Sequence, residues 1–171
     1  MDKLKGVRKL NNAITKIFEG FETGRFKLTD TYQYSMYDYS VRYRITEGHI
    51  EDIWFNEFVK ERFGYTVTNT FLFSILHEIG HHKTIEDVYQ SDVIYEYCMN
   101  EKSRIDAEMQ TAGKKKSKIL EWEYFNLPDE IVATEWAVTY ARTHQTELRK
   151  IWEQCTEALA EFYEKNNVEE G

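Results

Sequence analysis

The sequence predicts an α+β protein that is mostly helical, with a small antiparallel sheet ahead of a central helix. A single proline among 171 residues and long Glu- and Lys-rich segments favour helices. Between residues 26 and 55, Tyr, Val, Ile and Thr dominate, which is typical of strands. With 42% hydrophobic and 15% aromatic residues, a chain of this length can bury a substantial core. We therefore expect one domain over residues 1–171.

The N-terminal part is expected to contain one helix and then the sheet. Residues 4–21 carry apolar side chains at helical spacing and predict an amphipathic helix. About three strands are expected between residues 26 and 55, because two runs of strand-forming residues flank Glu47-Gly48, a typical hairpin turn. Residues 54–64 are compatible with either a continued strand or a short helix.

The remainder of the chain is predicted to be helical. The central helix is expected over residues 69–83, because residues 70–76 contain neither glycine nor proline and are rich in large apolar residues. Further helices are expected over residues 86–110, 119–125, from Pro128 onward and 143–164. The lysine-rich stretch 112–118 predicts a solvated loop, with a loop facing a substrate as the alternative. No internal repeat and no second domain are evident.

Charge and cysteine content exclude several classes of protein. The formal net charge of −8 argues against general binding to nucleic acid or to a membrane surface, because both favour basic patches. The two cysteines are isolated, so the spacing of a zinc ribbon or a disulfide scaffold is absent. No stretch resembles a signal peptide or a membrane span. We expect a cytoplasmic protein.

The run His77-Glu78-Ile79-Gly80-His81 is the most informative part of the chain. Histidines four residues apart lie about 40° apart around a helix, so both imidazoles can bind one metal ion. The acid between them projects beside that ion, where it can act as general base on a water molecule. A surface helix that carries two histidines by chance is the alternative. The apolar residues before His77 argue against it, because they give this helix a core face opposite the histidines.

A catalytic zinc site usually needs a third protein ligand. The extended motif HExxHxxGxxH would supply a histidine, but Thr84 and Asp87 occupy its glycine and histidine positions. Glu130 is the preferred candidate, because Pro128 marks the start of a helix on which Glu130 heads a stripe of small residues. Such a stripe allows another helix to approach closely. Its members are Ala133, Thr134, Ala137 and Ala141.

Two alternatives to this ligand remain open. Glu130 can be an ordinary first-turn acid that complements the dipole of its helix. Glu101 can be the third ligand in its place, although the polar residues that follow it, Lys102, Ser103 and Arg104, fit a solvated face better.

Two motifs of the chain resemble those of the small HExxH zinc metallopeptidases of the ImmA/IrrE-like kind, which are compact gluzincin-type proteins of bacteria and phages. The first motif is HEIGH, and the second is ExxAxxWA, formed by Glu130, Ala133, Trp136 and Ala137. The resemblance implies a zincin-like fold, with a short sheet before the motif helix and helices after it. It makes His77, His81 and Glu130 the zinc ligands and Glu78 the catalytic base. The longer segment between the motifs and the lack of a helix-turn-helix segment depart from the family pattern.

The expected activity is zinc-dependent hydrolysis of a peptide bond in a protein or peptide substrate. Glu78 would move the proton, and His77, His81 and Glu130 would hold Zn²⁺. No residue of the sequence identifies itself as the group that stabilises the oxyanion; the tyrosines of residues 31–43 are candidates. A non-catalytic zinc-binding regulatory or interaction protein is the alternative, and a fourth protein ligand on the ion would favour it.

Overall fold

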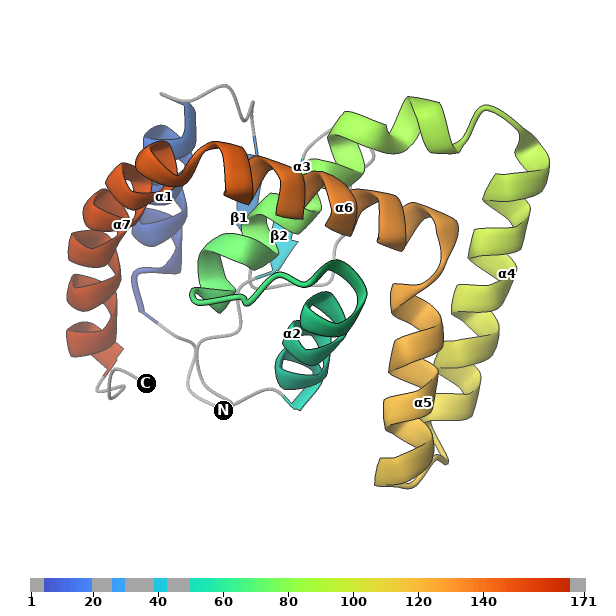
Figure 1. Ribbon diagram of the computed structural model, residues 1–171. Helices are drawn as coiled ribbons and strands as arrows, with labels where there is room; N and C mark the ends of the chain where they lie inside the picture. Colours follow the sequence, from blue (N-terminus) through green and yellow to red (C-terminus); the bar gives the residue numbers. More distant parts are fainter. Residues whose placement is uncertain (1–4, 20–25, 30–38, 43–49, 167–171) are drawn as a thin grey trace. The chain divides into compact units, whose positions relative to one another are not determined.

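The computed structural model describes four stretches of the chain: residues 5–19, 26–29, 39–42 and 50–166 (Figure 1). The described residues contain seven helices: α1 (Val7–Glu19), α2 (Ile50–Phe63), α3 (Thr70–Val88), α4 (Asp92–Met109), α5 (Lys114–Phe125), α6 (Pro128–Thr143) and α7 (Gln145–Asn166). They also contain two strands, β1 (Phe26–Thr29) and β2 (Tyr39–Arg42). Backbone contacts divide the chain into two compact units, residues 1–47 with 141–171, and residues 48–140. None of the described helices has both the length and the apolar character needed to cross a membrane.

The fold class is all-α, so the prediction of an α+β fold with an antiparallel sheet is wrong. The two described strands have four residues each and pair with each other in parallel, with Phe26 opposite Tyr39. Residues 50–55, expected as a strand, begin α2 instead. Trp54 and Phe58 are both buried at helical spacing, and this repeat outweighs the strand preference of the single residues. The expected hairpin turn at Glu47-Gly48 lies outside the described residues.

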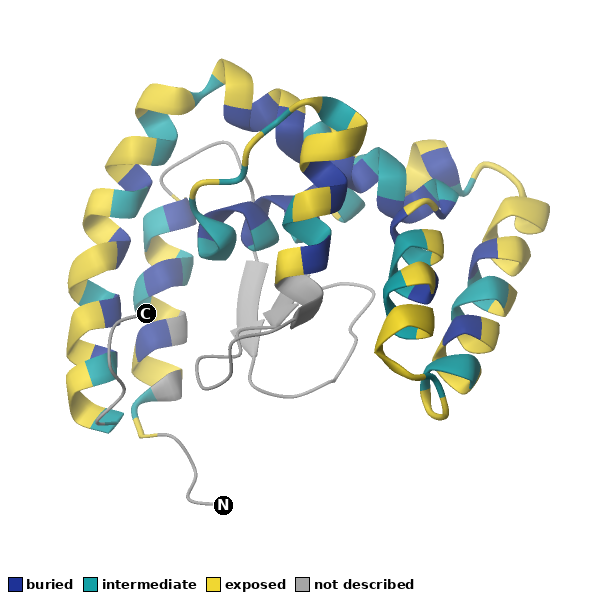
Figure 2. Ribbon diagram, turned by 60° about the horizontal axis from the view of Figure 1, so that its bottom comes forward, coloured by how far each residue is buried: buried dark blue, intermediate teal, exposed yellow. Residues whose placement is uncertain are grey.

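In the unit formed by the two ends of the chain, α1 packs against α7. Both helices are amphipathic, and in Figure 2 each alternates between buried and exposed residues along its length. The buried residues of the pair are Leu10, Ile14, Phe18, Ile151, Cys155, Leu159 and Phe162. The amphipathic helix expected near the N-terminus is therefore present. Its partner is α7, which confirms the expected C-terminal helix.

The second unit, residues 48–140, contains α3, whose buried residues lie between Leu72 and Gly80, with Val88 at the end of the helix. The Asn69 side chain accepts a hydrogen bond of 3.1 Å from the Leu72 amide, and this N-cap fixes where the helix begins. Gly64 has a positive φ of 64° and ends α2, which returns the chain toward α3. Helix α3 then extends to Val88, five residues beyond the expected Lys83.

Helix α6 makes a close backbone contact with α3 at Gly80. A Cβ atom added to Gly80 would lie 2.4 Å from the carbonyl oxygen of Ala133, which is closer than atoms can approach. The small residues predicted to allow such an approach are all buried, namely Ala133, Thr134, Ala137 and Ala141. The absence of a side chain at Gly80 therefore allows the ridge of α6 to pack directly against the α3 backbone.

Helices α4 and α5 form an antiparallel pair joined by a short turn (Figure 1). The expected lysine-rich loop is wrong in its second part, because residues 114–118 form the first turns of α5. Lysine is a good helix former, and the charges find partners: Lys116 pairs with Glu108 at 3.0 Å and Lys118 with Glu57 at 2.6 Å. The lysines therefore extend a helix instead of interrupting it.

Candidate metal centre

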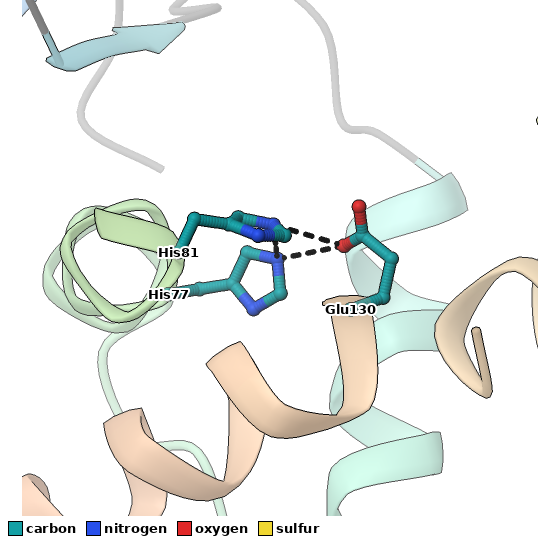
Figure 3. A group of neighbouring side chains, drawn as sticks. All are labelled: His77, His81 and Glu130. Carbon is teal, nitrogen blue, oxygen red and sulfur yellow. Dashed lines mark hydrogen bonds and ion pairs between the residues drawn. The ribbon is translucent and has the colours of Figure 1, made fainter. Parts of the chain in front are cut away.

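Three side chains from two helices converge within the unit of residues 48–140. His77 and His81 project from one side of α3, and Glu130 reaches them from the first turn of α6 (Figure 3). His77 and Glu130 are buried, and His81 is partly exposed. Among the described residues, these three form the group of His, Cys, Asp and Glu side chains that is able to hold a metal ion.

The distances between the three ligand atoms fit a tetrahedral ion. His77 Nε2 lies 3.0 Å from Glu130 Oε2, His81 Nε2 lies 3.2 Å from it, and the two Nε2 atoms are 3.1 Å apart. Ligands about 2.0–2.1 Å from a tetrahedral zinc ion are about 3.3 Å apart, so one ion can contact all three after a small adjustment. The donor set of two imidazoles and one carboxylate also fits zinc, which binds nitrogen and oxygen ligands of this kind.

Thr134 sets the tautomer of His77. Its hydroxyl donates a hydrogen bond of 2.9 Å to the Glu130 carbonyl, so the single hydroxyl proton is used there. His77 Nδ1 lies 3.1 Å from the same hydroxyl oxygen, which can then only accept. With a metal ion bound to Nε2, Nδ1 would therefore carry the proton and donate it to the Thr134 oxygen. This is the arrangement that metal-binding histidines generally require of their other ring nitrogen.

The second oxygen of the Glu130 carboxylate is held by α4. Lys102 donates hydrogen bonds of 2.8 Å to Glu130 Oε1 and 2.5 Å to Asp129 Oδ2. Asp129 is itself buried. Its Oδ2 accepts a hydrogen bond of 2.6 Å from the Tyr89 hydroxyl, and its Oδ1 accepts one of 3.0 Å from the Glu130 amide. The Lys102 ammonium lies 5.3 Å from the centre of the Tyr124 ring. Glu130 is thus bound on both oxygens by different parts of the fold.

The charges of the site determine how its groups ionise without a metal. Burial opposes protonation of His81, but the adjacent Glu130 carboxylate outweighs it and raises the pKa of His81 to about 9. Burial likewise disfavours the charge of Glu130, and His81, His77 and Lys102 together hold its pKa well below the usual value. Burial acts against the charge of Lys102 as well, yet Glu130 and Asp129 raise its pKa. A proton on His81 therefore competes with a metal ion for the same position.

Glu78 and Phe55 flank the three converging side chains. Glu78 follows His77 on α3, is partly exposed, and lies close enough for its charge to raise the pKa of His81. The ring of Phe55, from α2, meets the His77 ring edge to face at a centroid distance of 5.2 Å. An aromatic ring thus packs against His77, and the acid of the motif is partly exposed.

The structure places most of the residues singled out in the sequence. It brings His77, His81 and Glu130 together, and Pro128 begins α6 as expected. Glu101 is not part of this group; its carboxylate accepts a hydrogen bond of 2.9 Å from Arg104 on the surface of α4. Most of the tyrosine-rich stretch 31–43 lies outside the described residues.

Sequence reasoning missed Lys102 and Asp129, and it missed the polar role of Thr134. Lys102 was taken as a sign that the face beside Glu101 is solvated, yet only 18% of its side chain is exposed. A lone lysine carries no signal of this kind, since its partners come from α6, about 27 residues further along. Thr134 could have been found, because a threonine four residues after a ligand on one helix face can contact the same site.

Comparisons with protein-family models, with curated proteins and with solved structures gave no match for this chain.

Proposed function

We propose that the protein is a zinc-dependent metallopeptidase that hydrolyses a peptide bond in a protein or peptide substrate. His77, His81 and Glu130 hold the zinc ion, and Glu78 is the general base. The sequence resemblance to the ImmA/IrrE-like metallopeptidases supports this proposal, although it covers two short motifs only.

The observation that carries the proposal is the convergence of three ligand atoms within 3.2 Å of one another, with the acid of the motif beside them. The ligand atoms come from segments 49 to 53 residues apart, so their meeting is not a consequence of helix geometry alone. A buried carboxylate beside two histidines is costly to maintain unless its charge is matched. Lys102 pairs with Oε1 of this carboxylate, and a divalent cation between Oε2 and the histidines would supply positive charge at the other oxygen.

The residues of the site divide the chemistry between them. Zinc bound here would supply Lewis acidity, which polarises the scissile carbonyl and acidifies a water molecule. The Glu78 carboxylate takes one proton from the attacking water as the new carbon–oxygen bond forms. It then delivers that proton to the amide nitrogen as the carbon–nitrogen bond breaks. Partial exposure of Glu78 suits this role, because water must reach it.

The decisive experiment is the substitution Glu78→Gln, which keeps the shape of the side chain and removes the base. We expect the variant to retain one equivalent of zinc and to lose hydrolysis by at least about 100-fold, because general-base catalysis contributes about 10²–10⁴-fold. Zinc is measured in the purified protein. Hydrolysis is measured by comparing new peptide termini in a proteome digest treated with wild type or variant.

Glu86→Gln is the matched control, because Glu86 lies on the same helix and is exposed. It should leave both zinc content and the new termini unchanged. Full activity of the Glu78→Gln variant would show that Glu78 is not the general base. A wild-type protein that holds zinc and produces no new termini would exclude the peptidase.

A non-catalytic zinc protein is the second candidate. Structural zinc sites normally have four protein ligands, whereas three ligand atoms converge among the described residues. This difference favours the peptidase, because a catalytic ion keeps one position for water or substrate. X-ray absorption of the zinc-loaded protein separates the two: three protein ligands and one water favour the enzyme, and four protein ligands favour the structural site.

A further inference from the structure

Lys102 contacts the carboxylate of a proposed zinc ligand without being a candidate ligand itself. It reaches Glu130 from α4, and its Nζ lies 2.8 Å from Oε1, the oxygen turned away from the histidines. The other oxygen, Oε2, faces His77 and His81. One oxygen of the Glu130 carboxylate therefore contacts Lys102, and the other contacts the two histidines.

We propose that Lys102 is a positioning residue that restricts Glu130 to one ligand oxygen and so fixes the metal centre in a four-coordinate form. This inference rests on the proposed metal centre. It adds a residue that neither the HExxH motif nor the glutamate helix contains.

The geometry supports binding of the ion through one oxygen of Glu130 only. A carboxylate can bind an ion through one oxygen or through both. With Oε1 held by an ammonium group, rotation that would bring both oxygens to one ion requires breaking a charge-assisted hydrogen bond. Single-oxygen binding keeps the coordination number low, which suits zinc, whereas magnesium and calcium require six or more ligands. Lys102 thereby biases the site toward zinc and leaves room for one exchangeable ligand.

Lys102 is itself held in place from several directions. Asp129 Oδ2 accepts a hydrogen bond of 2.5 Å from Lys102 Nζ, and the centre of the Tyr124 ring lies 5.3 Å from the same nitrogen. Asp129 is anchored in turn by the Tyr89 hydroxyl and the Glu130 amide. A lysine fixed by a carboxylate and an aromatic ring loses little entropy when it also holds Glu130. The ammonium is thus a rigid part of the site.

The charge of Lys102 alone would have the opposite effect on metal binding. A positive group next to the site repels a divalent cation, so its removal by itself should tighten metal binding. Positioning predicts weaker binding when the lysine is lost, because the charge-assisted hydrogen bond that restrains Oε1 of Glu130 is then absent. Asp129 balances the ammonium. The double substitution Lys102→Met with Asp129→Asn removes one charge of each sign and isolates positioning from charge.

The test measures metal binding and the spectrum of the cobalt-substituted protein. Co²⁺ replaces zinc, and its visible absorption is intense when four-coordinate and weak when five- or six-coordinate. Wild type should give the intense spectrum. Lys102→Met and the double variant should lose much of that intensity and bind zinc about 10–100-fold more weakly in competition with a chromophoric chelator, as is typical when an outer partner of a ligand is lost.

Lys118→Met is the matched control. Lys118 also pairs with a carboxylate, Glu57 at 2.6 Å, and lies over an aromatic ring, Trp122 at 5.3 Å, but it contacts no ligand. Its spectrum and zinc affinity should equal those of wild type. The double variant also guards against misfolding of Lys102→Met, because it leaves no unpaired buried acid at position 129; circular dichroism checks both.

The outcomes separate this inference from the proposed function. Unchanged or tighter zinc binding with an unchanged cobalt spectrum in the double variant would overturn the role of Lys102 and leave the peptidase untouched. A wild-type protein that binds zinc but hydrolyses no peptide bond would overturn the peptidase and leave Lys102 in its role. A wild-type protein that binds neither metal would overturn both.

Discussion

Individual side chains determine whether the site can bind a metal, and Glu130 is the most consequential of them. It joins two histidines from α3 to a lysine from α4, and its exposed fraction is 5%. An acid buried this deeply needs partners on both oxygens. Here a lysine provides for one oxygen, and two imidazoles, or an ion between them, provide for the other.

Glu130→Ala should abolish stable zinc binding. Loss of an outer partner already costs about 10–100-fold in metal affinity, so loss of a ligand should cost more than about 100-fold. Glu101→Ala is the comparison, because Glu101 is the alternative ligand left open by the sequence and is bound to Arg104 on the surface. It should keep one equivalent of zinc. Metal analysis of the two purified variants decides; the reverse pattern would move the third ligand to Glu101.

Thr134→Val should weaken zinc binding by about 10–100-fold without removing any ligand. Valine has nearly the shape of threonine but offers no oxygen to His77 Nδ1, so the histidine loses the partner that fixes its tautomer. Thr134→Ser keeps the hydroxyl and should bind zinc nearly as tightly as wild type. Competition with a chromophoric chelator measures both. Equal affinity in the valine variant would show that the tautomer is set in another way.

At the scale of elements, the crossing of α3 and α6 brings the three proposed ligands together. Histidines on α3 can bind nothing with Glu130 unless α6 passes close to the α3 backbone, and Gly80 is where it does. The stripe of small residues on α6 supplies the other half of this contact. The four-residue spacing of the histidines is a property of one helix, whereas the third ligand depends on this packing.

Gly80→Ala should destabilise the protein although alanine is the better helix former. The added Cβ would lie 2.4 Å from the Ala133 carbonyl oxygen, so the helices must separate, which costs about 1–3 kcal/mol and exceeds the gain of about 1 kcal/mol in helix propensity. The added methyl of Gly113→Ala meets nothing within 4 Å, so this control variant should change the free energy of unfolding by less than about 1 kcal/mol. Urea unfolding measures both. Equal stability of the Gly80 variant would show that α6 can move away at no cost.

At the scale of the whole molecule, the chain forms two compact units, and all residues of the candidate site belong to residues 48–140. The other unit combines the two ends of the chain, with α1 packed against α7. The helix periods of both were readable in the sequence, because each carries a single apolar stripe. Their pairing was not, since 125 residues (20–144) lie between them.

The sheet is where sequence reasoning failed, and the reason is local. Tyrosines and β-branched residues before position 56 favour strands singly, but Trp54 and Phe58 repeat at the helical period and are buried on one face of α2. Burial of one helix face stabilises α2 by more than the strand preferences of its individual residues oppose it. The prediction for residues 114–118 was also wrong, because this run of charged residues was interpreted as a loop, whereas it forms the first turns of α5.

The sequence by itself determined that two histidines and an acid share one helix, because the period of the α-helix fixes their spacing before any packing occurs. It also singled out Glu130, since the small-residue stripe behind it indicates a close helix contact. Tertiary structure alone decided that Lys102 and Asp129 belong to the same site. Those contacts join different helices, and no periodicity along a chain records which helices become neighbours when it folds.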